Sequence, residues 1–449
     1  MRLAAWDKQV LWHPFTQQAE WSSREPVIIT SGQGVWLKDS RGRRLLDGNS
    51  SLWVNVWGHN HPVLNAAIRK QLSKIAHSTF LGLTHEPAIR LARKLIAIAP
   101  PGLSRVFYSD NGSTAVEVAI KMAYQYWQLT GHPKKTKFVS LKEGYHGDTL
   151  GSVSVGGIDL FHERFRGLLF KGWMVDPPPA AAGDDDFSHR HPRGRSRGSI
   201  DDVLRKHRHE IAAVVMEPLI QGASGMLLMP KGYLSHVRRL CQKYQVLLIV
   251  DEVATGFGRT GTMFACEQEG GTPDFLCVAK SLTGGYLPLA ATLTKERIYR
   301  AFLGRYDEFK TFFHGHTYTA NPLACAAALA NLDLYRKENL LRNVRELSKQ
   351  LAQGLAPLRD HPHVKEVRQL GLMAGIELVQ DKKTGKPYPP SRRMGLKVCD
   401  AALKRGVWLR PLADVIVVMP PLSISERELA FLTRVIREAI DEATSDDIS

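Results

Sequence analysis

The sequence DFLCVAKSLTGG at residues 274–285, together with VLLIVDE at residues 246–252, decides the fold. Each stretch contains an apolar run of strand length that ends in a charged side chain, Lys280 in the first and Asp251 in the second. Such uniformly apolar runs are typical of strands that are covered on both faces, as in parallel sheets. We therefore predict an α/β domain in which both charges lie at the ends of buried strands.

The flanking sequence alternates between strand and helix patterns. Residues 211–216 form another apolar run, and residues 232–244 have helical periodicity, which predicts a βαβ unit with the strand that follows. Residues 106–108 and 137–141 predict further strands, and residues 114–129 between them predict a long helix. This alternation indicates a mainly parallel sheet in a large α/β domain.

The length of 449 residues favours two domains. A hairpin pattern at 34–47 and a strand pattern at 372–378 indicate a second, smaller α+β domain built from both ends of the chain. We expect an N-terminal segment of this small domain at 1–60, the large domain at 61–325, and the rest of the small domain at 326–449.

The composition is that of a soluble globular protein, with 44% apolar and 23% charged residues. No apolar run reaches the length of a membrane span, and Asp7 and Lys8 interrupt the only apolar stretch near the start that resembles a signal peptide. The five cysteines are scattered and form no CxxC pair, which favours reduced thiols over disulfides or a zinc site. We expect a cytoplasmic protein without a membrane partner and without a metal site.

The chain is basic, with 60 Lys and Arg residues against 44 Asp and Glu residues and a formal charge of +16. This charge suits anionic substrates and phosphorylated cofactors, and it would also permit nucleic-acid binding. The densest basic stretch, residues 189–198, contains no aromatic side chain and is best interpreted as a solvated loop. We therefore expect small-molecule substrates and no nucleic acid.

Lys280 and Asp251 together indicate the chemistry of pyridoxal phosphate (PLP). A lysine that follows a buried strand is partly desolvated, so its amine is nucleophilic and can form a Schiff base with the PLP aldehyde. A buried aspartate needs a cationic partner, and the protonated pyridine nitrogen of PLP would provide one. An ion pair between Asp251 and Arg259 is the alternative, in which the aspartate has a purely structural role.

Other strand ends supply the remaining parts of such a site. Gly112 and Ser113 lie between a strand and a long helix, where a phosphate binds well, although a helix cap would use the same residues. Tyr145 lies beside glycines at a strand end and could stack on a flat ring or belong to a tight turn. His146 is an acid–base candidate or a structural histidine, and Glu217 follows a buried strand and points out of the sheet.

The chain resembles the class III aminotransferases of PLP fold type I. The strings that carry the resemblance are DEVATGFGRTG at 251–261 and AKSLTGG at 279–285, and the similarity extends from Trp12 to about Leu422. It implies an α/β fold whose large domain has a mainly parallel sheet of the seven-stranded type, with a smaller α+β domain. It also implies PLP as the cofactor and a homodimer with shared active sites.

Five further short segments resemble the branch of the class that aminates the ketone of 8-amino-7-oxononanoate in biotin synthesis. These segments are WHPFT at 12–16, SSLW at 50–53, GYHGDT at 144–149, HGHTY at 314–318 and GVWLRP at 406–411. By this resemblance Lys280 is the catalytic residue. The implied cofactor-binding residues are Gly112, Ser113, Tyr145, Asp251, Lys280, His316 and Thr317, of which His316 and Thr317 would reach the partner subunit's cofactor. The implied substrate-binding residues are Phe15, Leu52, Trp53, Tyr145, Gly315 and Arg410, with Arg410 meeting the substrate carboxylate.

Two positions bear on the amino donor. Members of the branch that use S-adenosylmethionine have a tyrosine where this chain has Phe15 and a tryptophan where it has Leu52. Losing a hydroxyl and an aromatic wall weakens the grip on an adenine, so these residues favour L-lysine as donor over S-adenosylmethionine. The alternatives are another class III aminotransferase acting on an ω-amino acid or a diamine, and, more remotely, a non-catalytic nucleic-acid-binding protein of the same fold.

Overall fold

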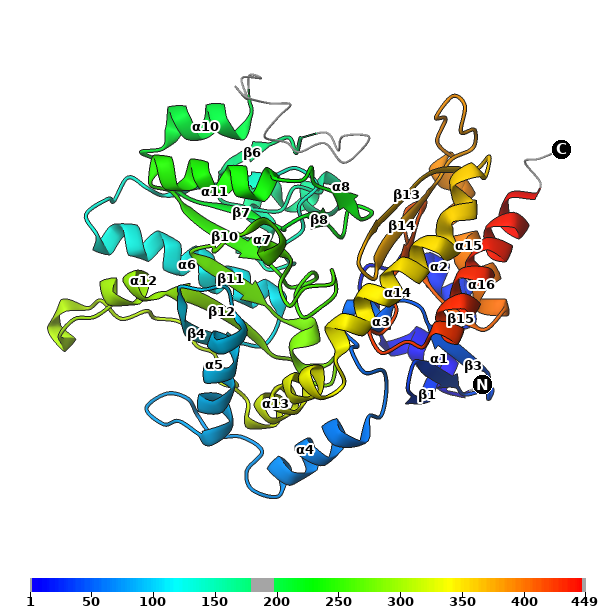
Figure 1. Cartoon of the computed structure of the whole chain (residues 1–449), viewed down its shortest axis with the longest axis horizontal. Coiled ribbons are helices and arrows are strands. Elements are labelled where there is room, and N and C mark those ends of the chain that lie inside the picture. The colour runs from blue at the N-terminus through cyan, green and yellow to red at the C-terminus, as the bar shows by residue number, and fades with distance from the viewer. Residues whose placement is uncertain (1, 179–197, 446–449) are drawn as a thin grey trace.

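The structure of the chain is a computed structural model that describes residues 2–178 and 198–445. The basic stretch predicted to be a solvated loop, residues 189–198, lies outside the described residues except for Gly198. Figure 1 shows two parts side by side, a larger one around one sheet and a smaller one that contains both chain ends.

The larger part is built on a seven-stranded sheet in the order β4-β12-β11-β10-β7-β5-β6. The pairs from β11 across to β6 are parallel, whereas β12 is antiparallel to both of its neighbours. The predicted mainly parallel sheet is thus confirmed. The strands are β4 (Leu103–Ser109), β5 (Lys137–Leu141), β6 (Trp173–Val175), β7 (Ile211–Met216), β10 (Leu247–Asp251), β11 (Phe275–Val278) and β12 (Ala290–Lys295).

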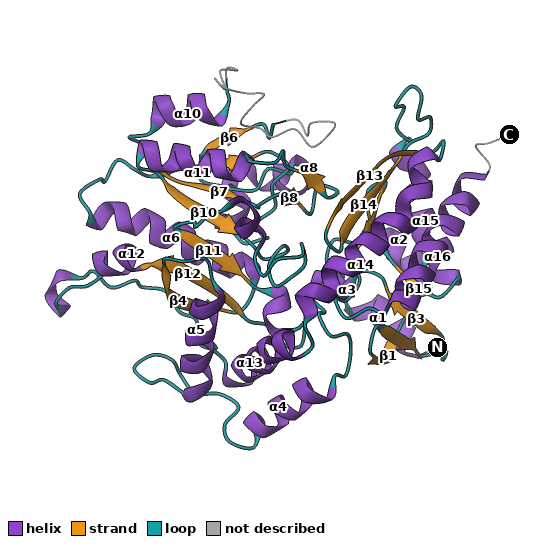
Figure 2. Ribbon diagram, in the orientation of Figure 1, coloured by secondary structure: helices purple, strands orange, loops and turns teal. Residues whose placement is uncertain are grey.

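Strand β10 shows why these runs are almost entirely apolar. Leu247 and Ile249 pack into a core with helix α6, whereas Leu248 and Val250 pack into the core on the opposite face, with helices α5 and α11. Successive side chains of a strand point to opposite faces, so a sheet covered on both faces needs apolar residues at every position. Figure 2 shows helices around the sheet. They are α5 (Glu86–Ile98), α6 (Gly112–Leu129), α10 (Ile200–His207), α11 (Tyr233–Tyr244), α12 (Glu296–Ala301) and α13 (Pro322–Lys337).

The smaller part contains two four-stranded sheets. One joins β1 (Ile29–Gln33), β2 (Trp36–Asp39), β3 (Arg44–Asp47) and β15 (Val407–Trp408), so β3 near the N-terminus pairs with a strand more than 350 residues later. The other joins β13 (Val364–Leu370), β14 (Met373–Leu378), β17 (Val415–Val418) and β16 (Arg410–Leu412). Helices α14 (Leu340–Leu355), α15 (Met394–Lys404) and α16 (Glu426–Thr444) pack beside them. The expected domain boundaries at residues 60 and 325 stay predictions.

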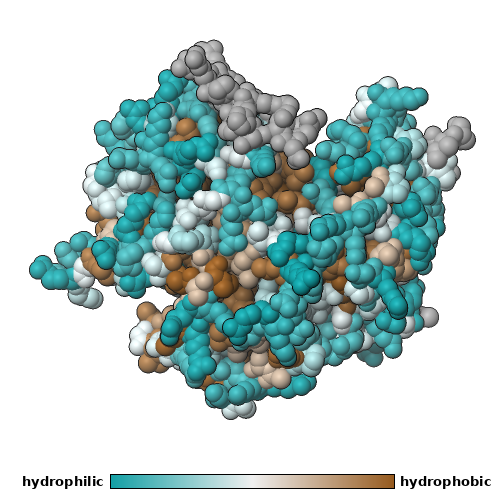
Figure 3. All heavy atoms as spheres, in the orientation of Figure 1, coloured by the Kyte–Doolittle hydropathy of each residue, from teal (hydrophilic) through white to brown (hydrophobic). Residues whose placement is uncertain are grey.

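The remaining α-helices and strands of the described residues lie between these elements or at the start of the chain. They are α1 (Arg2–Val10), α2 (Gln18–Ser23), α3 (Ser50–Trp53), α4 (Pro62–Leu72), α7 (Leu150–Ser154), α8 (Asp159–His162), β8 (Ile220–Gln221) and β9 (Leu227–Leu228). Within residues 2–178 and 198–445, no helix combines the length and the apolar character needed to cross a membrane. On the face drawn in Figure 3, hydrophilic side chains cover most of the surface and hydrophobic ones gather near its centre.

Candidate active site

A cavity of about 430 Å³ lies where several strands of the large sheet end. Asp251 is the last residue of β10, Lys280 follows β11, and Glu217 follows β7, so all three come from the carboxyl ends of parallel strands. Ligands in open α/β sheets bind at this edge. The lining residues are Trp53, Asn111, Gly112, Ser113, Tyr145, His146, Gly147, Asp148, Thr149, Glu217, Ala223, Asp251, Val253, Ala254 and Lys280.

Asp251 is buried and held by two contacts. Its Oδ2 lies 2.8 Å from His146 Nδ1, and its Oδ1 accepts a hydrogen bond of 3.0 Å from Val253 N. Burial lowers the pKa of His146, but the contact with Asp251 and the charges of Asp251 and Glu217 outweigh burial and raise it above its ordinary value. A protonated imidazole behind the carboxylate would keep Asp251 charged and oriented.

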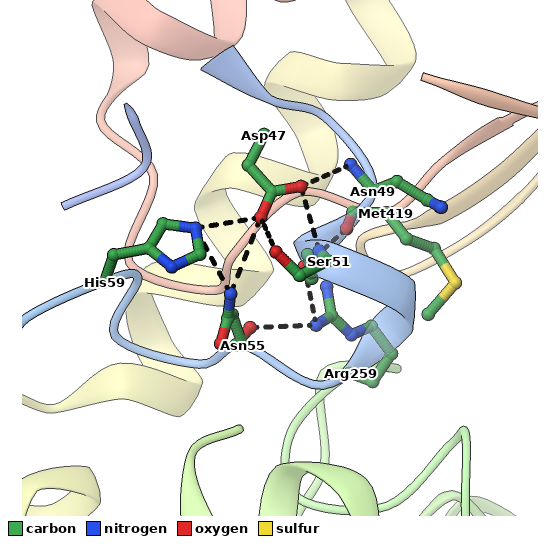
Figure 4. A network of polar contacts seen from close by, with 8 residues as sticks. Asp47, Asn49, Ser51, Asn55, His59, Arg259 and Met419 are labelled. Carbon is green, nitrogen blue, oxygen red and sulfur yellow. Dashed lines mark hydrogen bonds and ion pairs between the residues drawn. The ribbon is translucent and has the colours of Figure 1, made fainter. Parts of the chain in front are cut away.

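Arg259 does not pair with Asp251, so the alternative of a structural Asp–Arg ion pair is wrong. Its guanidinium is fully buried and donates to the carbonyl of Pro420 at 2.6 Å. A second nitrogen lies 3.4 Å from both Ser50 Oγ and Asn55 O, as Figure 4 shows for Asn55. Arg259 thereby ties the large part to the segment around residue 50 and leaves Asp251 available for a ligand.

Lys280 has the electrostatic setting that nucleophilic chemistry requires. Burial lowers the pKa of its amine, and the charges of Asp251 and Glu217 only partly offset this effect. A lowered pKa increases the fraction of neutral, nucleophilic amine near neutral pH. The lysine has φ of 44°, and its Nζ lies 4.9 Å from the centre of the Trp53 ring.

Gly112 and Ser113 form a cradle at the N-terminus of α6, with Asn111 as the capping residue. A Cβ on Gly112 would lie 2.5 Å from Val253 Cγ1, and a Cβ on Gly147 would lie 2.3 Å from Ser113 Oγ, so both positions require glycine. Ser113 Oγ also accepts a hydrogen bond from Thr149 N at 3.0 Å. The positive end of an 18-residue helix, with a hydroxyl beside it, is suited to a phosphate.

Tyr145 lines the cavity between the carboxylates of Asp148 and Glu217. Its hydroxyl donates to Asp148 Oδ2 at 2.8 Å, and its backbone N–H donates to Glu217 Oε2 at 3.1 Å. Burial and the charge of Asp148 raise the pKa of the phenol, so it stays neutral. The ring is thus fixed at both ends beside the space that a flat cofactor would occupy.

Glu217 is a functional candidate to which sequence reasoning gave no defined role. It accepts hydrogen bonds from Gly222 N at 2.9 Å and from Tyr145 N. Burial raises its pKa to about 7, and the charge of Asp251 adds to this rise while His146 opposes it. The position after a buried strand was the available signal; the pKa depends on His146 and Asp251, which are distant in sequence.

The predicted substrate residues Phe15 and Arg410 lie outside the cavity itself. Phe15 is 56% exposed, and its ring packs at 5.3 Å against Phe161, which in turn lies 6.3 Å from Tyr145. The Arg410 guanidinium lies 5.8 Å from the Phe15 ring and influences the pKa of Tyr145. These rings extend from the cavity wall towards a half-buried cation.

Leu52 and Trp53 belong to a turn with unusual backbone geometry. The φ angle is 48° at Ser50, 50° at Ser51, 95° at Leu52 and 69° at Trp53. Four consecutive non-glycine residues are therefore left-handed. Such geometry costs roughly 1–2 kcal/mol per residue. The turn buries Trp53 against the cavity and leaves Leu52 44% exposed.

Gly315, His316 and Thr317 do not line the cavity of their own chain. Gly315 and Thr317 are exposed, and His316 Nε2 lies 3.7 Å from Asp110 Oδ1, just before the phosphate cradle. The single chain therefore brings together Gly112, Ser113, Tyr145, Asp251, Lys280 and Trp53, and leaves the 315–317 segment at its surface.

Comparison with known proteins agrees with this geometry. The family described as aminotransferase class-III matches residues 17–440. The adenosylmethionine-8-amino-7-oxononanoate aminotransferase of Nitratidesulfovibrio vulgaris is 52% identical over 99% of this chain and 82% of that protein. The protein of the same name from Geobacter sulfurreducens is 49% identical, with 98% of both chains covered.

Solved structures give the same result. The crystal structure of the protein of this name from Methanocaldococcus jannaschii has a TM-score of 0.93 and 46% identity, covering 98% of this chain and 99% of that one. The ω-transaminase of Pseudomonas jessenii in complex with PMP has a TM-score of 0.92 at 31% identity, covering 99% and 98% of the two chains.

Proposed function

Because the chain belongs to the PLP-dependent class III aminotransferases, whose fold type I it shares, we propose that it transfers an amino group to 8-amino-7-oxononanoate and forms 7,8-diaminononanoate in biotin synthesis. The observation that carries this proposal is the identity of about 50% with relatives named for this acceptor over nearly the whole chain. The ω-transaminase, by contrast, is 31% identical.

The residues around the cavity fit PLP. Gly112, Ser113 and Gly147 line the cavity at the N-terminus of α6, where the positive end of the helix and the Ser113 hydroxyl would bind a phosphate. A Cβ on either glycine would clash with Val253 or Ser113 beside that position. Asp251 would hold the pyridine nitrogen, and Lys280 would hold the aldehyde carbon. When bound, PLP supplies a ring that withdraws electrons from the carbon bearing the amine.

The chain's own residues perform the positioning and the proton transfers. Asp251, supported by His146, keeps its negative charge facing the ring. Burial lowers the pKa of the Lys280 amine, so the neutral amine can take a proton from the substrate carbon. The same amine would then give this proton back later in the reaction. Tyr145 and Trp53 form walls of the cavity that holds this amine.

The Arg410 guanidinium is the proposed partner of the acceptor's distant carboxylate. It is half-buried and close to Phe15, and no carboxylate among the described residues lies within ion-pair distance of it. A guanidinium can bind a carboxylate through two parallel hydrogen bonds. The run of aromatic rings from Tyr145 to Phe15 would line the path of the aliphatic chain between the ketone and that carboxylate.

We propose L-lysine as the amino donor. Leu52 offers no aromatic face and Phe15 offers a ring without a hydroxyl, so an adenine would lose one stacking surface and one hydrogen bond at these walls. The names of the relatives include adenosylmethionine, which makes that donor the competing outcome.

We further propose a homodimer with shared active sites. Exposed apolar side chains gather on two adjacent segments, with Leu81 and Leu83 on one and Phe309, Phe313 and Tyr318 on the other. Exposed apolar side chains that gather in this way are typical of a protein–protein interface. The exposed Gly315 and Thr317 lie within the second segment, where a partner subunit's cavity could receive them.

The proposal is tested by two half-reactions of the PLP-loaded protein, followed at the cofactor absorbance. Lysine alone should bleach the yellow colour, and 8-amino-7-oxononanoate should then restore it and yield the diamine by mass spectrometry. Bleaching by S-adenosylmethionine and not by lysine would refute the donor. Recovery with simple ω-keto compounds but not with 8-amino-7-oxononanoate would refute the acceptor.

A further inference from the structure

The turn at residues 50–53 lacks the residues that normally permit its geometry. Glycine accepts positive φ without steric cost, yet the turn reads SSLW. A run of four such residues persists only when the surroundings fix it. The turn also delivers Trp53, whose ring faces the Lys280 amine, so whatever holds the turn also shapes the site.

Asp47, the last residue of β3, makes the contacts that hold the turn. Its carboxylate is fully buried, and Oδ1 accepts from Ser51 N at 2.9 Å and from Asn49 N at 3.4 Å. Oδ2 accepts from Ser51 Oγ at 2.7 Å. Figure 4 shows the carboxylate directed at Ser51 and at the start of the turn.

The far end of the turn returns to the same carboxylate. His59 Nε2 lies 3.0 Å from Asp47 Oδ2, and Asn55 Nδ2 lies 3.5 Å from it. The beginning of the turn is anchored separately, because Ser50 Oγ donates to Met419 O at 2.5 Å. One carboxylate thus binds residues before, within and after the left-handed segment.

Trp53 is fixed as a consequence. Its indole N–H donates to Asn49 Oδ1 at 2.9 Å, and Asn49 N is itself a donor to Asp47. The ring also approaches Gly222, where a Cβ would lie 3.3 Å from Trp53 Cζ3. The ring therefore has little freedom as long as the turn keeps its shape.

We propose that Asp47 is a positioning residue for substrate binding, acting through Ser51 and Trp53. Asp47 does not line the cavity, and it stabilises the left-handed turn that places Trp53 beside Lys280. The acceptor named in the test rests on the proposed function, whereas the role of Asp47 does not.

The test is Asp47→Asn in the PLP-loaded protein. The amide keeps the size of the side chain, but its NH2 group cannot accept the hydrogen bonds that Ser51 and Asn49 donate. We expect the KM for 8-amino-7-oxononanoate to rise at least about tenfold, since charged hydrogen bonds are lost, and kcat to change less than about threefold. The cofactor absorbance should stay the same. Asp39→Asn is the matched control, because Asp39 is a buried carboxylate at the end of β2 that accepts from Arg41 N and Arg43 N, away from the cavity.

A rescue variant separates positioning from general stability. In Asp47→Asn/Ser51→Gly, glycine adopts positive φ without help, so KM should return to within about threefold of the wild type. An Asp47→Asn enzyme with wild-type KM, an equal rise in Asp39→Asn, or no rescue by Ser51→Gly would overturn the proposal. If Asp47→Asn does not fold, Ser51→Ala removes one of the same hydrogen bonds; a KM raised about threefold supports the proposal, and an unchanged KM refutes it.

Failure of the acceptor is distinguishable from failure of this proposal. If the wild-type enzyme does not use 8-amino-7-oxononanoate, the proposed function falls, but the donor half-reaction with lysine or S-adenosylmethionine still compares the variants at the cofactor absorbance. The same ranking of donor affinities is expected there, with Asp47→Asn weakened and both Asp39→Asn and the rescue variant close to the wild type.

Discussion

Replacing Glu217 with glutamine tests the electrostatics of the cavity. The ordinary pKa of a glutamate is 4.5, and burial raises that of Glu217 to about 7. The folded protein therefore holds a proton that the unfolded chain releases in this range, so the free energy of unfolding falls as the pH rises from 4.5 to 7. A difference of about 2.5 pKa units corresponds to roughly 3 kcal/mol above pH 7.

Glu217→Gln removes this pH-dependent fall in the free energy of unfolding, because glutamine does not ionise. Unfolding entropies of about 2.1 cal/mol/K per residue give roughly 0.9 kcal/mol per degree for a chain of 449 residues. Between pH 5 and pH 8 the Tm of the variant should therefore gain about 3 °C relative to the wild type. The glutamine also loses one hydrogen bond from Gly222 N or Tyr145 N, but this cost does not depend on pH.

The measurement is differential scanning fluorimetry of the PLP-free protein at several pH values, since the raised pKa belongs to the site without the cofactor. The quantity to compare is the Tm difference between variant and wild type at each pH. The lost hydrogen bond lowers this difference equally at every pH, so only the ionisation of Glu217 changes it. A Tm difference that stays constant between pH 5 and pH 8 would refute the account of Glu217, because the carboxylate would then ionise as easily in the folded state as in the unfolded one.

Two further predictions concern the cofactor and the acceptor. Gly112→Ala should weaken PLP binding at least about tenfold in an absorbance titration, because its Cβ would displace Val253, whereas Gly167→Ala, with open space around its Cα, should bind PLP normally. Equal PLP affinity in both would contradict the cradle. In steady-state kinetics, Arg410→Ala should raise the KM for 8-amino-7-oxononanoate about 30-fold or more and leave kcat nearly unchanged. The reason is that the substrate carboxylate loses a charged hydrogen bond of roughly 2 kcal/mol, which corresponds to that factor. A lower kcat at unchanged KM would place Arg410 in a different role.

The sequence alone predicted the sheet well, and it predicted that Asp251 and Lys280 lie at the ends of neighbouring strands. The residues before Asp251 in β10 and all residues of β11 are apolar. Strands that are covered on both faces require this pattern. Strand β12 was not predicted, and its antiparallel direction could not have been, since strand direction depends on the connection through space and not on the residues of the strand.

The contacts between distant residues could not be predicted in the same way. His146 meets Asp251 across 105 positions, and Arg259 meets Pro420 across 161, so neither pair leaves a local pattern. The left-handed turn at 50–53 contradicts local propensity, because nothing in SSLW favours positive φ. Its geometry comes from Asp47 and His59, which flank it and act through tertiary contacts.

Lys280 is the residue proposed to hold PLP and to move the proton. Borohydride reduction of the PLP-loaded protein, followed by peptide mass spectrometry, tests this proposal most directly. We expect the pyridoxyl mass on Lys280, and we expect Lys280→Ala to show neither this label nor turnover. Label on another lysine, or normal turnover of Lys280→Ala, would contradict it.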